Sequence, residues 1–313
     1  MNDISSWDLG TCVPDSLLGK SGYLLIYQRN IEYLSLATDG SCLRSARKGL
    51  PGLHVRNFKS LRGVSWKGLQ NYSELNTLRL LLDINAPHLT SLELEILECQ
   101  YYQSLLEVEI SGSIRNLLSS PILALPFPDM RLQFPSLRSL SLTGLPLECT
   151  DVDVKELISA LNISGLRKLR LLGCRSVLSF PQAIQEMVTK LQLESFELAL
   201  LDKLEDDISF QNTLSSCLAS FRGLRDFRLF SDLFHRPLAI SSAIDCHRTT
   251  LRQLVLHDRR SLSRNLNVAV ERSALYDMFN DECQYPGQFP GLEGVGLGTN
   301  CSLKVSVLSL VKL

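Results

Sequence analysis

The feature that most constrains this chain is a repeated six-residue pattern, L-x-x-L-x-L, in which other apolar residues can replace the leucines. From residue 137 onward the pattern begins at Leu137, Leu166, Leu193, Leu224, Leu251 and Leu292, at intervals of 29, 27, 31, 27 and 41 residues. The last two apolar positions lie two residues apart, so in a strand both point to the same side. The repetition predicts a solenoid in which each unit buries that side against its neighbours.

Between these strand patterns the sequence changes to helical spacing, with apolar residues three or four positions apart. The segments with this spacing are 151–161, 179–191, 206–221 and 267–279. Ser179 is a candidate N-cap, and Pro181 suits a first helical turn. One strand and one return helix per unit predict an α/β leucine-rich repeat solenoid. This is a horseshoe with a parallel β-sheet on its concave face and helices or loops on its convex face.

A looser version of the pattern precedes residue 137. It begins at Ile31, Leu61, Leu75, Leu89 and Leu105, and from Leu61 onward the intervals are 14, 14 and 16 residues. Such intervals are too short for a strand and a helix, so they predict strands joined by tight returns. The expected organisation is an irregular N-terminal segment over 1–30 and a single solenoid over 31–313. The solenoid has irregular short repeats over 31–136 and regular strand–helix repeats over 137–313.

The C-terminal residues begin another strand pattern with Val305, Leu308 and Leu310, and no polar cap follows them. Because a solenoid normally closes its ends with an atypical polar repeat, two expectations remain open. Either a partner covers this edge, or the chain is a piece of a longer protein.

The charge balance argues against two classes of partner. The chain has 32 basic and 33 acidic residues, a net charge of -1, so no overall field attracts nucleic acid or an anionic membrane. Nine cysteines, an odd number with no C-x-x-C pair, indicate a reduced compartment. Neither a signal-peptide core nor an apolar run of membrane-spanning length occurs. We therefore expect a cytoplasmic or nuclear protein.

Motifs for catalysis or cofactor binding are weak. Gly19-Lys20-Ser21 resembles the end of a phosphate loop, but Pro14 stands where the earlier glycine is required. A G-x-G-x-G run at 294–298 lies inside a strand pattern rather than in a turn that opens a helix. The sequence predicts no cofactor.

The histidines lack the spacing of metal ligands, and the sequence predicts no metal site. Cys246 and His247 are adjacent, which would point their side chains apart in a strand or a helix. Cys174 ends an L-x-x-L-x-L-x-x-C phrase, where a small residue suits the turn out of the strand. We therefore predict a non-catalytic protein without catalytic residues, and an enzyme is the least favoured alternative.

The outward positions of the regular strands form the candidate binding surface, expected on the concave face. The residues proposed to contact a protein ligand are Lys168, Arg170, Glu197, Asp226, Arg228, Phe230 and His257. Arg170 and Arg228 should lie in one column with Glu197 between them, bordered by Phe230 and His257. Arginine and aromatic side chains dominate binding energy at protein interfaces, which favours recognition. Equally, Glu197 could simply neutralise two arginines on a solvated sheet.

Three phrases carry a resemblance to a known family. They are I-E-Y-L-S-L from Ile31, F-P-S-L-R-S-L-S-L from Phe134 and L-R-K-L-R-L-L-G-C from Leu166. With them the chain, from about Ile31 to its end, resembles the leucine-rich repeat region of fungal F-box proteins. The resemblance implies that the repeats select a substrate, while an F-box holds the adaptor of a cullin-type ubiquitin ligase.

The chain departs from that family at its start, because residues 1–30 contain no L-P-x-E-I-like opening and are too short for three helices. The F-box itself is not evident, so contact with the ligase adaptor would require one upstream. The resemblance therefore favours substrate recognition, and a leucine-rich repeat scaffold or regulator unrelated to ubiquitin is the alternative.

Overall fold

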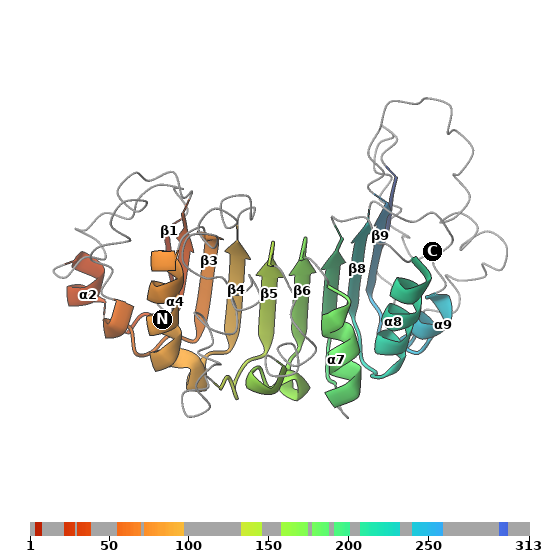
Figure 1. The fold of residues 1–313 in the computed structure, drawn as a ribbon, viewed down its shortest axis with the longest axis horizontal. Coiled ribbons are helices and arrows are strands. Elements are labelled where there is room, and N and C mark those ends of the chain that lie inside the picture. The colour runs from red at the N-terminus through yellow and green to blue at the C-terminus, as the bar shows by residue number, and fades with distance from the viewer. Residues whose placement is uncertain are drawn as a thin grey trace, which may run out of the picture. The chain divides into compact units, whose positions relative to one another are not determined.

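The strands of this computed structural model run parallel and several are joined by helices, so the fold is α/β (Figure 1). Its residues group into two compact units, 1–165 and 166–313, which are considered separately below. The structure describes residues 4–7, 22–28, 30–38, 55–69, 72–96, 133–145, 158–174, 177–187, 191–200, 207–231, 240–258 and 294–299. None of the described helices has the length and apolar character needed to cross a membrane.

Unit 1 contains five described strands, each parallel to the next. They are β1 (Ile4–Trp7), β2 (Tyr33–Ala37), β3 (Gly63–Leu69), β4 (Ser91–Ile96) and β5 (Ser139–Thr143). The apolar residues of the repeated pattern alternate into the core, as Leu92 and Leu94 of β4 do. Polar residues occupy the other side, and the register aligns Ser65 with Glu93, whose Oε2 accepts a 2.8 Å hydrogen bond from the serine hydroxyl.

The prediction of a short-repeat strand at Leu75 is wrong, because this segment belongs to helix α4 (Tyr72–Asn85). The same letters satisfy both periods: Leu75, Leu78 and Leu82 are three and four residues apart and are all buried on one helical face. Without Leu75, the patterns that start at Ile31, Leu61 and Leu89 are 30 and 28 residues apart. These intervals match the regular repeats, and the pattern at Leu105 lies outside the described residues.

The prediction of an irregular segment over residues 1–30 is also wrong at Ile4–Trp7. These residues form strand β1, which pairs in parallel with β2. A further turn of helix, α2, spans Tyr23–Tyr27. Residues 4–9 read I-S-S-W-D-L, which fits the six-residue pattern, whereas the short helix α2 does not carry it.

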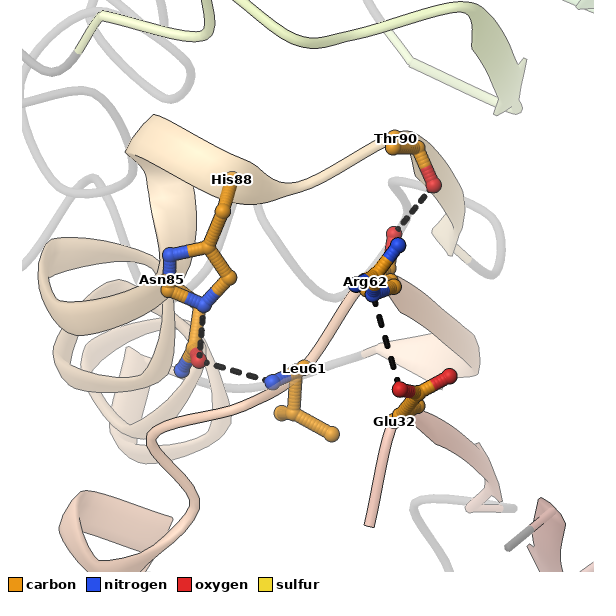
Figure 2. Close-up of polar contacts among 6 residues, drawn as sticks. All are labelled: Glu32, Leu61, Arg62, Asn85, His88 and Thr90. Carbon is orange, nitrogen blue, oxygen red and sulfur yellow. Dashed lines mark hydrogen bonds and ion pairs between the residues drawn. The ribbon is translucent and has the colours of Figure 1, made fainter. Parts of the chain in front are cut away.

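Asn85 ties helix α4 to the start of strand β3. Its side chain is fully buried at the end of the helix, and its Oδ1 accepts a 3.0 Å hydrogen bond from the backbone N–H of Leu61. Its Nδ2 donates to the carbonyls of Phe58 and Leu81, both at 2.8 Å. His88 Nε2 lies 3.2 Å from the same Oδ1 (Figure 2). The amide therefore satisfies backbone groups of two elements in a place that water does not reach.

The same view shows how successive repeats of unit 1 are connected just before their strands begin. The Thr90 hydroxyl donates to the carbonyl of Arg62 at 2.9 Å, and Arg62 Nε lies 3.5 Å from Glu32 Oε1 (Figure 2). The residues just before β2, β3 and β4 thus form a row across unit 1. Short 3-10 turns, η1 (Val55–Asn57) and η2 (Ala86–His88), precede β3 and β4.

Unit 2 also contains five described parallel strands. They are β6 (Lys168–Leu172), β7 (Ser195–Ala199), β8 (Asp226–Ser231), β9 (Gln253–Asp258) and β10 (Gly294–Thr299). The last of them confirms that the G-x-G-x-G run lies in a strand. Helices α7 (Ser179–Met187) and α8 (Asp207–Ala219) confirm two predicted helices, although both are shorter than predicted. A third helix, α9 (Ser241–Asp245), was not predicted.

Two predicted helices remain largely untested. In the segment 151–161 only residues 158–160 are both described and helical, and they lie in unit 1 before turn η6 (Ile163–Gly165). The segment 267–279 lies outside the described residues.

The core of unit 2 lies between its strands and its helices. The register aligns Leu169, Phe196, Phe227 and Leu254 across β6 to β9, and all four are buried. Helices α7 and α8 lie side by side on one side of the sheet (Figure 1). Their own buried side chains include Phe180, Ile184, Phe210, Leu214 and Leu218.

The alternate strand residues point away from this core and form what we call the polar face of unit 2. Its half-buried or exposed members are Lys168, Arg170, Leu172, Ser195, Glu197, Asp226, Arg228, Phe230, Gln253 and Val255.

Candidate protein-recognition face

The parallel register of β6 to β9 brings the predicted binding residues together on the polar face. One row aligns Lys168, Ser195, Asp226 and Gln253; a second aligns Arg170, Glu197, Arg228 and Val255; a third aligns Leu172, Ala199, Phe230 and His257. Neighbouring strands of a sheet lie about 4.8 Å apart, so each row is a ladder of adjacent side chains. The predicted order, with Glu197 between Arg170 and Arg228, is confirmed.

Two outward positions do not behave as the alternating pattern predicts. Ala199 is buried, and in unit 1 Ser141 is buried with its hydroxyl lacking a hydrogen-bond partner among the described residues. The side chain of His257 is not described, so only its backbone position beside Phe230 can be stated.

Glu197 is paired with Arg170 in the middle row. Arg170 Nε lies 2.9 Å from Glu197 Oε2, and Arg170 Nη2 donates to Oε1 at 3.5 Å. Although Nε is close, its N–H forms no hydrogen bond with any described atom, so this short contact is an ion pair without hydrogen-bond alignment. The Glu197 side chain is 14% exposed and that of Arg170 is 43% exposed. The carboxylate therefore lies low between the strands, partly covered by the guanidinium.

Arg228 follows a different course from Arg170. Its Nη2 donates a 2.9 Å hydrogen bond to Gln253 Oε1 on the neighbouring strand β9. Among the side chains that the structure describes, Arg228 has no acidic ion-pair partner. Glu197 therefore neutralises only one of the two arginines in this row, Arg170. Arg228 lies beside a neutral amide instead of a carboxylate.

Apolar side chains border Arg228 on two sides. Val255 is its partner in the register, and Phe230 lies two residues further along β8 on the same face. Both side chains are half-buried, and each leaves part of its apolar surface exposed. An arginine next to a partly exposed aromatic ring combines the two residue types that most often dominate binding at protein interfaces.

Cys246 and His247 do not form a nucleophile pair. The His247 imidazole is buried, its Nε2 lies 2.9 Å from the Leu218 carbonyl, and its ring packs against Phe221 at a centroid distance of 5.0 Å. A carbonyl accepts only from a protonated nitrogen, so Nε2 carries the hydrogen. Cys246 Sγ points instead to the Ser242 carbonyl at 3.7 Å. His247 thus serves to attach the turn after α9 to the end of α8.

Burial lowers the pKa of His247 below its ordinary value of 6.5, and the nearby Arg222 lowers it further, while the hydrogen bond to Leu218 opposes both effects. Its Nδ1 has no hydrogen-bond partner among the described residues, so a second proton would be buried without compensation.

Cys217 is a buried thiol on helix α8, and burial raises its pKa to about 12. Cys217 therefore stays protonated and is a poor nucleophile.

The His247 environment predicts that acid destabilises unit 2. Because the folded pKa is lowered, the unfolded chain binds more protons once the pH falls below about 6.5. The free energy of unfolding should be unaffected by His247 above that pH. Below it, the free energy of unfolding should fall by up to about 1.4 kcal/mol for each unit by which the pH drops, until the pKa of the folded state is reached. Urea unfolding between about pH 7.5 and about pH 5 measures this slope. The His247→Gln variant, which cannot titrate, should have a shallower slope, and an unchanged slope would contradict the assignment.

Among the residues described, no three or more His, Cys, Asp or Glu side chains come together as a metal site. Cys174 is buried at the end of β6, with Sγ 3.8 Å from the Leu172 carbonyl, as suits a turn residue. In comparisons with known proteins, the chain matches no family model, no curated protein and no solved structure.

Proposed function

We propose that this chain is a non-catalytic leucine-rich repeat module that binds a protein ligand on the polar face of unit 2. The observation that carries the proposal is Arg228, whose charge has no acidic partner among the described side chains and which lies beside the partly exposed Phe230. A guanidinium that is pre-positioned by Gln253 loses little freedom when it donates to a ligand carbonyl or carboxylate. The apolar surface of Phe230 and Val255 would add the desolvation that most protein interfaces require.

The repeat geometry supports the horseshoe class. The strand patterns recur at 27–31 residues through most of unit 2 and at 30 and 28 residues in unit 1. A strand followed by a helical return at this period suits leucine-rich repeats, whose sheet offers a broad and rigid binding surface. Ligand residues would then contact side chains from several strands at once.

The F-box resemblance supports a more specific role, the selection of a substrate for a cullin-type ubiquitin ligase. All three resembling phrases, which begin at Ile31, Phe134 and Leu166, overlap strands, namely β2, β5 and β6. The alternative is a scaffold or regulator unrelated to ubiquitin; because Ile4–Trp7 form strand β1, which pairs with β2, the ligase role would require an F-box upstream of that strand. Co-purification of the ligase adaptor with the chain, or with a version extended upstream, would favour the ligase role, and its absence from both would favour the scaffold.

A double variant, Arg228→Ala with Phe230→Ala, should weaken ligand capture strongly and change folding little. These positions suit the test better than Arg170, because removing Arg170 would leave the largely buried Glu197 carboxylate without its ion-pair partner. Loss of an arginine and an aromatic anchor should cost about 2–4 kcal/mol of binding, a factor of about 30 to about 1,000 in affinity. Quantitative affinity purification from the native source, followed by titration of the enriched protein, measures the loss.

The matched control is Ile208→Ala, which removes an exposed apolar side chain from helix α8 on the other side of unit 2. It should capture the same proteins as the unmodified chain. Identical captured proteins and affinities for the double variant, with an unchanged thermal midpoint, would reject the polar face as the binding surface.

A further inference from the structure

The residues that lead into the strands of unit 2 form a second ladder, next to the polar face. The backbone N–H of Glu194 donates to the Arg167 carbonyl, that of Arg225 to the Glu194 carbonyl, and that of Arg252 to the Arg225 carbonyl, each at 2.8 Å. Arg167, Glu194, Arg225 and Arg252 therefore lie side by side where β6, β7, β8 and β9 begin. Among the described strand entries of unit 2, three of these four consecutive positions are arginines, which makes this part of the edge basic.

Two more arginines come from the turns that enter β8 and β9. Arg222 is exposed, and its Nη1 donates to the carbonyls of Ala219 at 3.0 Å and Phe221 at 2.9 Å, which holds its guanidinium against the end of helix α8. Arg248 is exposed just after α9. We name the group formed by Arg167, Arg222, Arg225, Arg248 and Arg252 the arginine rim.

The five arginines of the rim outnumber the carboxylates that the structure describes near them, which are Glu194, Asp226 and Asp245. Glu194 is shared, with Oε1 3.1 Å from Arg167 Nη1 and Oε2 3.7 Å from Arg225 Nη1, so one negative charge faces two positive ones. Asp245 has its Oδ1 buried without a hydrogen-bond partner among the described residues, so this oxygen points away from solvent. Counted over the described residues, the rim is thus net positive on a chain whose total charge is -1.

We propose that the arginine rim binds an acidic stretch of polypeptide in the protein that occupies the polar face, an inference that rests on the proposed function. Guanidinium groups bind carboxylates through paired N–H donors, and a row of them at strand spacing offers successive carboxylates a fixed set of partners. The row Lys168, Ser195, Asp226 and Gln253 follows the ladder directly along the strands, so one ligand can cover both surfaces.

A polypeptide fits the rim better than a nucleic acid does. The Glu194 carboxylate lies within the ladder between Arg167 and Arg225, where it would repel a continuous phosphate backbone. Single-stranded nucleic acids also require aromatic side chains beside the basic groups for base stacking. Phe230 lies toward the other end of β8, four residues beyond its first residue, Asp226. An acidic peptide needs only spaced carboxylates, which the arginines can share with Glu194.

The experiment measures binding of a fluorescein-labelled oligoglutamate peptide to the full chain by fluorescence anisotropy. The Arg225→Gln/Arg252→Gln variant should raise the dissociation constant at least about fivefold, because two charge-assisted contacts are lost. Added salt should weaken binding to the unmodified chain, as expected for exposed charges. The matched control is Arg62→Gln, which changes an arginine at the equivalent strand-entry position of unit 1, where Glu32 is its partner. The control should keep the dissociation constant within about twofold.

Three outcomes would overturn the inference: no oligoglutamate binding by the unmodified chain, equal effects of the rim and Arg62 variants, or tighter binding of a single-stranded RNA through the same arginines. The test is separable from that of the proposed function. If the polar face does not bind protein, the Arg228→Ala/Phe230→Ala variant still captures its partners, whatever the rim does. If only the rim inference fails, that variant loses its partners while Arg225→Gln/Arg252→Gln retains its affinity for oligoglutamate.

Discussion

Replacing Phe196 with alanine should lower the free energy of unfolding of unit 2 by about 3–5 kcal/mol. The Phe196 side chain is 1% exposed in the middle of β7, so its removal leaves a cavity that rigid neighbouring strands cannot close. It also contacts the ring of Phe227, its register partner on β8, at a centroid distance of 5.9 Å and an interplanar angle of 38°. The tilted arrangement of two rings adds to the stabilisation by apolar burial.

Urea denaturation of the full chain, followed by near-ultraviolet circular dichroism, measures the effect. A double-mutant cycle with Phe196→Leu and Phe227→Leu should give a coupling of about 0.5–1.5 kcal/mol between the two rings. Ile208→Ala is the control, because its side chain is 53% exposed and its loss should change stability by less than about 0.5 kcal/mol. A loss below about 1 kcal/mol for Phe196→Ala would show that Phe196 does not belong to a rigid core.

The second large effect is expected in unit 1, where Asn85→Ala should cost roughly 2–6 kcal/mol. This change leaves the Leu61 N–H without its 3.0 Å acceptor and the Phe58 carbonyl without its 2.8 Å donor. Each buried backbone group that loses its partner costs about 1–3 kcal/mol. Because both groups belong to the segment that enters β3, the damage should be concentrated where helix α4 meets that strand.

Hydrogen exchange tests this prediction at a single backbone amide, that of Leu61. The Leu61 amide should exchange much faster in Asn85→Ala, because its hydrogen-bond acceptor is gone, while amides in the core strands of unit 2 should change little. His88→Ala is the control: it removes only the 3.2 Å contact to Asn85 Oδ1 and leaves the Leu61 hydrogen bond in place. Equal protection of the Leu61 amide in Asn85→Ala and the unmodified chain would exclude the proposed role of Asn85.

Most strands were predictable because the signal that defines them is local. Leu169 and Leu171 are two residues apart, and both are buried on the same side of β6. Any strand has this alternation, whatever surrounds it. The helix α4 was missed because Leu75 and Leu78 suit a strand pattern and a helical face equally. Only the packing of the neighbouring elements selects between two periods in so short a segment.

The candidate face was predictable to the level of register. When the repeats are aligned on their leucines, Arg170, Glu197 and Arg228 occupy the same position of successive strands. Glu197 therefore lies between the two arginines. The choice of partner was not predictable, because it depends on side-chain conformations across three strands. Arg170 contacts Glu197, whereas Arg228 contacts Gln253. The arginine rim was overlooked for a different reason: its members come from strand entries and from turns, which no single periodicity joins.

The sequence by itself determined the repeat, the positions that enter the core and the order of side chains along each row of the polar face. These follow from the two-residue period of a strand and from the similar spacing of most repeats along the chain, both of which can be read from the sequence. The tertiary structure alone decided that Asn85 satisfies the entry to β3, that His247 is a buried packing residue and that Arg228 is left without an acidic partner among the described side chains. Each of these depends on atoms 24 to 29 residues apart that meet only when one repeat packs on the next.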